Sequence, residues 1–187
     1  MVHAETRDEW RAWLAENHGR PSGVWLATYK KATGKPRIDY EEAVEEALCF
    51  GWVDSKSNAL DDERSLLWMS PRKPRSGWSR INKERIERLE RDGLMTDAGR
   101  AVVEEAKRNG SWTSLDSVEA LEVPDDLAGA LARNAKARKH FEAFPPSSKK
   151  IILTWIASAR RDETRQRRIA ETVRLAERNI RANHYRQ

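Results

Sequence analysis

The segments of this chain that favour β-structure all lie before residue 70, and the regular patterns after residue 79 are helical. Residues 23–30 are rich in β-branched and aromatic side chains, which predicts a strand. Residues 52–56 and 65–69 are extended segments on either side of a polar turn, which predicts a hairpin. Because strands grouped before helices do not fit an alternating βαβ sheet, the sequence predicts an α+β fold. We expect an N-terminal small antiparallel sheet with helices packed on it, followed by a helical C-terminal portion.

Capping residues and apolar spacing place the helices. Thr6–Glu9 and Asp39–Glu42 are capping boxes, so we expect helices over residues 7–17 and from residue 40 to Cys49. The same signals predict helices over Ser79–Gly93, Thr96–Gly110, 125–131, 135–144 and 149–158, and a last helix with an apolar stripe of Ile169, Val173, Ala176 and Ile180. Residues 111–124 have no regular pattern. The sequence therefore predicts an α+β body over residues 1–124 and a helical portion over residues 125–187.

Composition narrows the class of protein. Hydrophobic residues make up 39% and charged residues 35% of the chain, which leaves enough apolar side chain for a core. A single cysteine, Cys49, excludes an intramolecular disulfide, and the four histidines belong to no metal-binding motif, so we expect no metal and no cofactor. The chain has no apolar run of membrane-span length and no signal-peptide pattern at its start, so we expect a cytoplasmic protein without membrane insertion.

Two strands of the predicted sheet carry the first candidate site. By alternation along a strand, Trp52, Asp54 and Lys56 fall on one face, and Trp68 lies on the neighbouring strand. An aromatic wall with one acid and one base is a common lining of a small-molecule pocket. The alternative is that the tryptophans are core residues and that Asp54 and Lys56 form an ion pair at the rim.

The loop after the hairpin is the second candidate. Arg72, Lys73 and Arg75 precede Trp78 and the helix that starts at Ser79. Fixed positive charge beside a helix N-terminus predicts an anion site, and the two prolines of the loop limit the entropy lost on binding. The alternative is a solvated connector whose arginines pair with Glu84 and Glu87.

Basic residues are concentrated at the C-terminal end. The net charge of the chain is +5, and residues 160–187 contain nine arginines against four acids. Arg161, Arg165 and Arg168 have the spacing of one helix face, which could bind phosphate or carboxylate. The alternative is that these arginines dock the last helix on its neighbours.

Several segments carry a resemblance to a known family. They are Val24–Leu26 with Tyr29–Lys31, Tyr40–Lys56, Ser70–Pro74 with Trp78 and Ser79, Asn82–Arg85, Gly93–Thr96, Trp155–Ala159, and Glu163–Arg165 with Arg168 and Ile169. By these segments, nearly the whole chain resembles the YdeI/OmpD-associated, or bacteriocin-protection, family. The resemblance implies a role in stress or antimicrobial tolerance and a periplasmic setting for some members. It supplies no established catalytic residue or cofactor to assign to this chain.

These observations favour a binding protein over an enzyme. We expect a cytoplasmic protein that binds a small anionic ligand or an acidic segment of a partner, with no assigned catalytic residue. One alternative is a nucleic-acid-binding protein that uses the basic loop and the Arg-rich helix, with an exposed Trp78 stacked on a base. Another is an unrecognised enzyme in which Asp54 forms an acid/base pair with Lys56 or Glu45.

Overall fold

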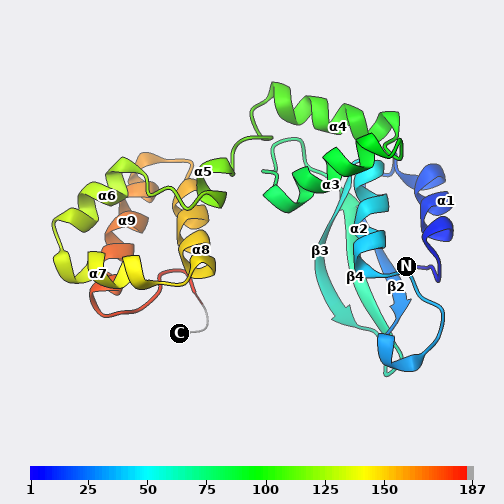
Figure 1. Cartoon of the computed structure of the whole chain (residues 1–187), viewed down its shortest axis with the longest axis horizontal. Helices are drawn as coiled ribbons and strands as arrows, with labels where there is room; N and C mark the ends of the chain where they lie inside the picture. Colours follow the sequence, from blue (N-terminus) through cyan, green and yellow to red (C-terminus); the bar gives the residue numbers. More distant parts are fainter. Residues whose placement is uncertain (185–187) are drawn as a thin grey trace. The chain divides into compact units, whose positions relative to one another are not determined.

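The computed structural model describes residues 1–184 and divides into two compact units (Figure 1). Unit 1 is Met1–Ser114, and unit 2 is Leu115–Gln187. Each unit has its own cluster of buried hydrophobic residues. In the part of the chain that the structure describes, no helix is long and apolar enough to cross a membrane.

Unit 1 contains a four-stranded sheet in the order β1-β2-β4-β3. The strands are β1 (Val2–His3), β2 (Val24–Tyr29), β3 (Trp52–Ala59) and β4 (Arg64–Pro71). The three longer strands pair antiparallel, as predicted, and β1 pairs parallel with β2. The sheet is therefore mixed, and a two-residue strand such as β1 is too short to show an alternating pattern in the sequence.

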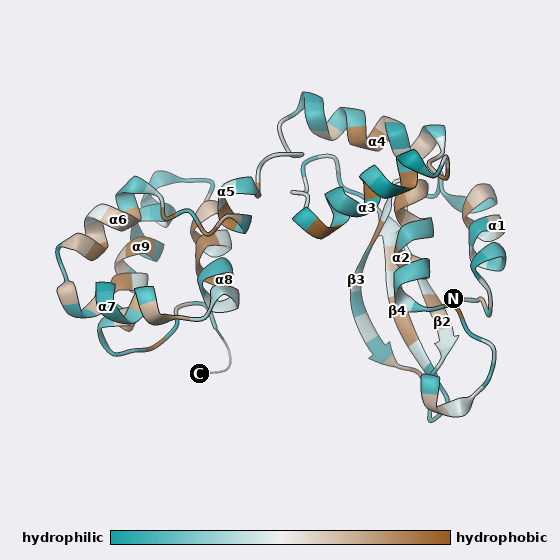
Figure 2. Cartoon of the chain, in the orientation of Figure 1, coloured by the Kyte–Doolittle hydropathy of each residue, from teal (hydrophilic) through white to brown (hydrophobic). Residues whose placement is uncertain are grey.

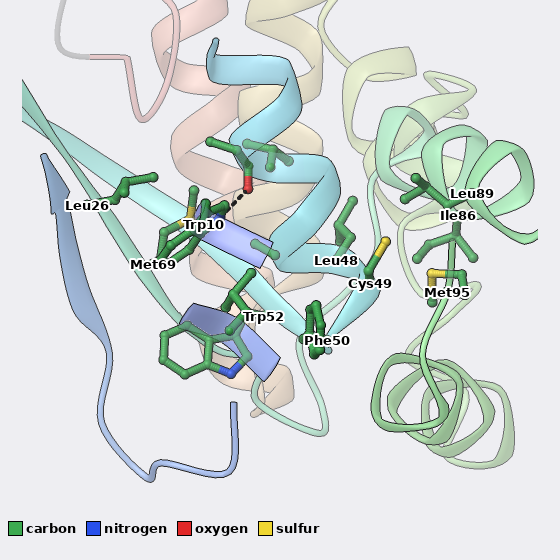
Figure 3. Close-up of a cluster of buried hydrophobic side chains, with 14 of the residues drawn as sticks. Trp10, Leu26, Leu48, Cys49, Phe50, Trp52, Met69, Ile86, Leu89 and Met95 are labelled. Atoms are coloured by element: carbon green, nitrogen blue, oxygen red, sulfur yellow. Dashed lines mark hydrogen bonds between the residues drawn. The ribbon is translucent and has the colours of Figure 1, made fainter. Parts of the chain in front are cut away.

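Four α-helices accompany the sheet: α1 (Arg7–Asn17), α2 (Tyr40–Cys49), α3 (Arg80–Arg91) and α4 (Asp97–Arg108), with a 3-10 turn, η1 (Lys31–Thr33), before α2. Leu26 and Met69 of the sheet share one core with Trp10, Leu48 and Leu89 of the helices (Figure 3). The Trp10 indole donates to the carbonyl oxygen of Ala43 at 3.0 Å, which satisfies its buried N–H. The α+β prediction is confirmed.

The opposite face of the sheet does not contribute to this core. Side chains alternate along a strand, so Trp25 lies on the face opposite Val24 and Leu26. Its cross-strand partner Trp68 shares that face, which we call the outer face. Figure 2 shows hydrophobic residues along β4 and hydrophilic residues over the far part of β3.

A β-bulge interrupts the pairing of β3 with β4. Asp54 is paired with Met69 and Ser57 with Leu67, so β3 contains one more residue than β4 between these two pairs. An extra residue reverses the alternation of the side chains that follow it. The bulge therefore decides on which face Lys56 lies.

Unit 2 is helical, as predicted for the C-terminal portion. Its helices are α5 (Asp116–Glu119), α6 (Asp125–Ala132), α7 (Ala135–Ala143), α8 (Pro146–Ala157) and α9 (Asp162–Glu177). The short helix α5 lies in the segment that the sequence left without a pattern. The most buried side chains of unit 2 include Leu127, Phe141 and Ile152.

The last helix ends one turn before the predicted stripe does. Asn179 has a φ of 58°, and the Ile180 amide donates to the Leu175 carbonyl at 2.9 Å. A left-handed residue followed by this bond is a Schellman end, in which the residue after the turn packs back on the helix. Ile180 thus lies beyond α9 although its spacing is helical.

Candidate functional site

The loop between β4 and α3, residues 72–78, is held in place at several points; we call it the Arg72 loop. The carbonyl oxygen of Pro74 accepts from Asn109 Nδ2 at 2.8 Å and from Ser111 Oγ at 3.1 Å, and Ser76 Oγ donates to the Lys73 carbonyl at 2.8 Å. The Arg72 amide donates to the carbonyl of Gly51 at 3.0 Å. The loop is thus a braced element rather than a freely solvated connector.

Inside this loop the guanidinium of Arg72 is buried without an acid. Its Cζ lies 3.7 Å from the centre of the Trp78 ring, and Nη2 donates to the Gly77 carbonyl. Nε of Arg72 and Nε1 of Trp78 are buried with no hydrogen-bond partner among the described residues. Nη1 makes no hydrogen bond to the described residues and is not sealed from solvent. Burial lowers the pKa of Arg72 to about 10, and the charge of Asp54 opposes that shift.

Asp54 lies close enough to influence Arg72 without forming an ion pair with it. Its Oδ2 accepts a 2.8 Å hydrogen bond from the hydroxyl of Tyr40 at the start of α2. Burial and this hydrogen bond raise the pKa of Tyr40 to about 12. Arg85 of α3 also feels the charge of Asp54, but it forms its ion pair with Glu41, at 2.5 Å. Tyr40, Asp54, Arg72 and Arg85 therefore make one polar cluster next to the Arg72 loop.

Trp78 is enclosed by other rings and cations. It is 1% exposed, and its ring centre lies 5.0 Å from that of Trp112. The ammonium groups of Lys83 and Lys107 lie 5.4 and 5.8 Å from the Trp112 ring. Trp78 offers no free face to a base, so the expectation of an exposed Trp78 is wrong.

The residues predicted to form an aromatic wall are separated by the structure. Trp52 is 1% exposed in the core, where its indole donates to the His18 carbonyl at 2.9 Å. Asp54 is paired with the core residue Met69, whereas the ammonium of Lys56 lies over the outer-face ring of Trp68 at 5.8 Å. The expectation that Trp52, Asp54 and Lys56 share a face is wrong, because the bulge after Asp54 reverses the alternation.

The predicted enzyme pairs are not assembled. Asp54 and Lys56 lie on opposite faces of the sheet, as the pairing shows. Glu45 is buried on α2 and pairs with Arg7 at 3.2 Å and with Arg88. The thiol of Cys49 is buried, which raises its pKa to about 11 and leaves it protonated at neutral pH.

Lys73 and Arg75 project from the Arg72 loop into solvent, and neither forms an ion pair with a described residue. Glu84, one of the two acids considered as their partners, pairs instead with Arg80 at 3.0 Å. Two exposed cations therefore stand next to the buried one, at the N-terminal end of α3.

The arginines of the last helix serve mainly to dock it. Arg165 forms two hydrogen bonds to Asp126, at 2.6 and 2.9 Å. Arg168 donates to the Trp155 carbonyl and to Ser158 Oγ, at the C-terminal end of α8. Arg161 precedes α9 as its exposed N-cap. Two of the three arginines thus hold α9 on its neighbours.

Sequence reasoning missed Tyr40, Arg85 and Trp25 as neighbours of the candidate residues. Tyr40 and Arg85 occur at ordinary helix positions, and only the pairing of β3 beside α2 and α3 brings them to Asp54. Trp25 lies in a segment that the sequence predicts as a strand, but its pairing with Trp68 depends on the register of the two strands. Among the described residues, no group of three or more His, Cys, Asp or Glu side chains is placed to hold a metal ion.

Two family descriptions match the chain. "Domain of unknown function (DUF8412)" covers residues 2–102, and "Bacteriocin-protection, YdeI or OmpD-Associated" covers residues 120–179. No curated protein and no solved structure matches. The resemblance to the YdeI/OmpD-associated family is confirmed in unit 2, whereas the motifs quoted from the N-terminal half fall in the domain of unknown function. The chain therefore belongs to the DUF8412 domain family and, in residues 120–179, to the bacteriocin-protection, YdeI or OmpD-associated family.

Proposed function

We propose that unit 1 binds a small anionic ligand, or the acidic segment of a partner, at the Arg72 loop. The observation that carries the proposal is the buried guanidinium of Arg72, which has no carboxylate within ion-pair distance among the described residues. A buried charge without a partner costs free energy, so such a group is uncommon unless a ligand completes it. Clusters of this kind are typical of functional sites.

The neighbouring groups suit an oxyanion. Nη1 of Arg72 is open for a charge-assisted hydrogen bond, and the exposed Lys73 and Arg75 add two positive charges. The loop leads into the twelve-residue helix α3, whose N-terminal amides carry a partial positive charge. The bracing of the loop by Asn109 and Ser111 reduces the entropy lost on binding.

Asp54 limits the affinity of the site for plain anions. Its charge lies near Arg72 and is partly neutralised by the Tyr40 hydroxyl. The charge of Asp54 also favours the charged form of Arg72 when no ligand is bound. The site we propose is therefore one of moderate affinity and defined geometry.

The family description supports a wider role for the protein. We propose that ligand binding contributes to tolerance of bacteriocins or related stress, and that the protein acts in the cytoplasm. Cell fractionation with an antibody against the chain measures the second point, and recovery in the periplasmic fraction would exclude it.

Titration calorimetry with inorganic phosphate and with citrate tests the binding site. The double variant Arg72→Gln, Arg75→Ala should bind the better of the two anions about 10- to 100-fold more weakly, because it loses charge-assisted hydrogen bonds. Arg161→Ala, which removes an exposed arginine from unit 2, is the matched control and should bind like the wild type. Equal affinity of the double variant and the wild type, or no binding of either anion at millimolar concentration, would show that the proposal is wrong.

A further inference from the structure

The outer face of the sheet is aromatic rather than polar. A sheet face that turns away from the core normally carries polar side chains. Here the outer-face positions of β2 and β4 hold Trp25, Ala27 and Tyr29 opposite Trp68, Leu66 and Arg64. Ala27 is fully buried although it lies on this face, so its larger neighbours close over it. A contiguous aromatic face of this kind indicates an interaction surface.

Two pairs of rings lie along this face. The rings of Trp25 and Trp68 meet edge to face with centres 5.1 Å apart. The rings of His3 and Tyr29 do the same at 5.0 Å. Trp25 and Tyr29 are four residues apart on β2, which separates the two pairs by about 13 Å.

Positive charge accompanies both pairs. The ammonium of Lys56 lies 5.3 Å from the Trp25 ring and 5.8 Å from the Trp68 ring, and that of Lys35 lies 4.9 Å from the Tyr29 ring. Lys56 forms no ion pair with a described residue, whereas Lys35 and Arg64 pair with Glu63 and Asp61. No outer-face position of the paired strands holds an acid. Lys56 lies on this face because of the bulge in β3.

We propose that the outer face, formed by His3, Trp25, Tyr29, Lys56, Leu66 and Trp68, binds a single-stranded nucleic acid. Flat rings on an open four-stranded sheet stack on unpaired bases, and a nearby cation neutralises the phosphates. A span of about 13 Å suits a strand of only a few nucleotides, which is the lower end of known single-strand sites. This surface is separate from the Arg72 loop and does not depend on anion binding there.

Fluorescence polarisation with labelled oligo(dT) and oligo(rU) of ten nucleotides, at 50 and 200 mM salt, tests the proposal on the full chain. Trp68→Ala should weaken binding about fivefold to a hundredfold, because each stacked base contributes about 1–3 kcal/mol. Lys56→Glu changes an exposed residue, so it should leave the fold intact and weaken binding by about tenfold at 50 mM salt. Ile81→Ala removes an exposed apolar side chain of unit 1 that lies on α3, away from the sheet strands, and should bind like the wild type.

Three results would overturn the proposal. The first is a wild-type chain that does not bind either oligonucleotide at 50 mM salt. The second is binding that survives Trp68→Ala and Lys56→Glu but is lost in Arg167→Ala, Arg174→Ala, which would assign the nucleic acid to unit 2. The third is light scattering that shows a dimer dissociated by Lys56→Glu, which would assign the face to a second copy of the chain.

Discussion

At the scale of single residues, the contacts of Arg72 do not offset the free-energy cost of burying its charge. The ring of Trp78 and the Gly77 carbonyl fix the guanidinium in place. Burial lowers the pKa of Arg72, and neither of these two groups carries a negative charge that would offset the effect. The fold therefore holds the guanidinium in a defined position at some cost in the free energy of unfolding, as expected of a residue that serves binding.

Replacement of Arg72 by methionine tests that balance. We expect Arg72→Met to unfold with a free energy within about 1 kcal/mol of the wild type, or above it, because an apolar side chain of similar length removes the cost of the buried charge. Urea denaturation followed by Trp fluorescence measures the effect. Loss of more than about 2 kcal/mol would show instead that Arg72 is a structural staple of the loop.

The residue scale is also where the sequence was least informative about the site. Trp52 and Trp78 stand beside charged residues in the sequence, and either could have lined a pocket. Both are 1% exposed, because a large ring contributes more free energy inside the core than at a rim. Sequence spacing gives no signal for this choice, which depends on what packs above each ring.

At the scale of elements, α2 connects the parts of unit 1. Seven of its ten residues are buried, and two of these are glutamates. Glu46 pairs with Arg7 and Arg11 of α1, both at 2.5 Å, and Glu45 pairs with Arg88 of α3. The acids on one helix thus link it to both neighbours. Each buried glutamate has two arginine partners, so the loss of one arginine would still leave it a counterion, whereas loss of both would leave a buried charge unpaired.

The packing of α4 against the end of α2 depends on a glycine. A Cβ at Gly99 would lie 2.2 Å from the Cys49 carbonyl oxygen, whereas a Cβ at Gly129 of α6 would meet no atom within 4 Å. We expect Gly99→Ala to destabilise unit 1 by roughly 1–3 kcal/mol and Gly129→Ala to stabilise unit 2 by up to about 1 kcal/mol. Chemical denaturation of both variants measures these changes. If Gly99→Ala stabilised the protein as Gly129→Ala is expected to do, the close approach of α4 to Cys49 would be contradicted.

The elements themselves were largely predictable from the sequence, and the bulge was not. Caps such as Asp39 and Ser79 fixed the starts of α2 and α3, because a side chain that satisfies a free amide is a local feature. The bulge after Asp54 arises from pairing with a strand ten residues further on, and Asp-Ser-Lys-Ser has no glycine to mark it. The one extra residue of the bulge places Lys56 on the outer face of the sheet instead of beside Asp54.

At the scale of the whole molecule, charge and stability are divided between the two units. Unit 1 contains 20 Lys and Arg and 20 Asp and Glu, and unit 2 contains 15 and 10, so the whole excess of +5 belongs to unit 2. Many cations of unit 1 form ion pairs, as in the network around Glu41 and Glu46. Self-repulsion therefore acts mainly on unit 2.

Salt should affect the two units differently. We expect calorimetry to resolve two unfolding steps, of which the step of unit 2 moves to higher temperature between 20 and 500 mM NaCl because salt screens like charges. The step of unit 1 should move little. Gly99→Ala should lower the transition temperature of unit 1 alone and so identifies its step. A single transition, or equal salt-induced shifts of both steps, would contradict the division of charge and stability between the two units.

The uneven charge has a practical consequence at the bench. A sulfonate resin at neutral pH would retain the protein through residues 115–187, with little help from the rest. A protease that cut the chain between Gly110 and Asp116 would yield one fragment that washes through the column and one that requires salt for elution. Chromatography alone would then purify each half in a single step.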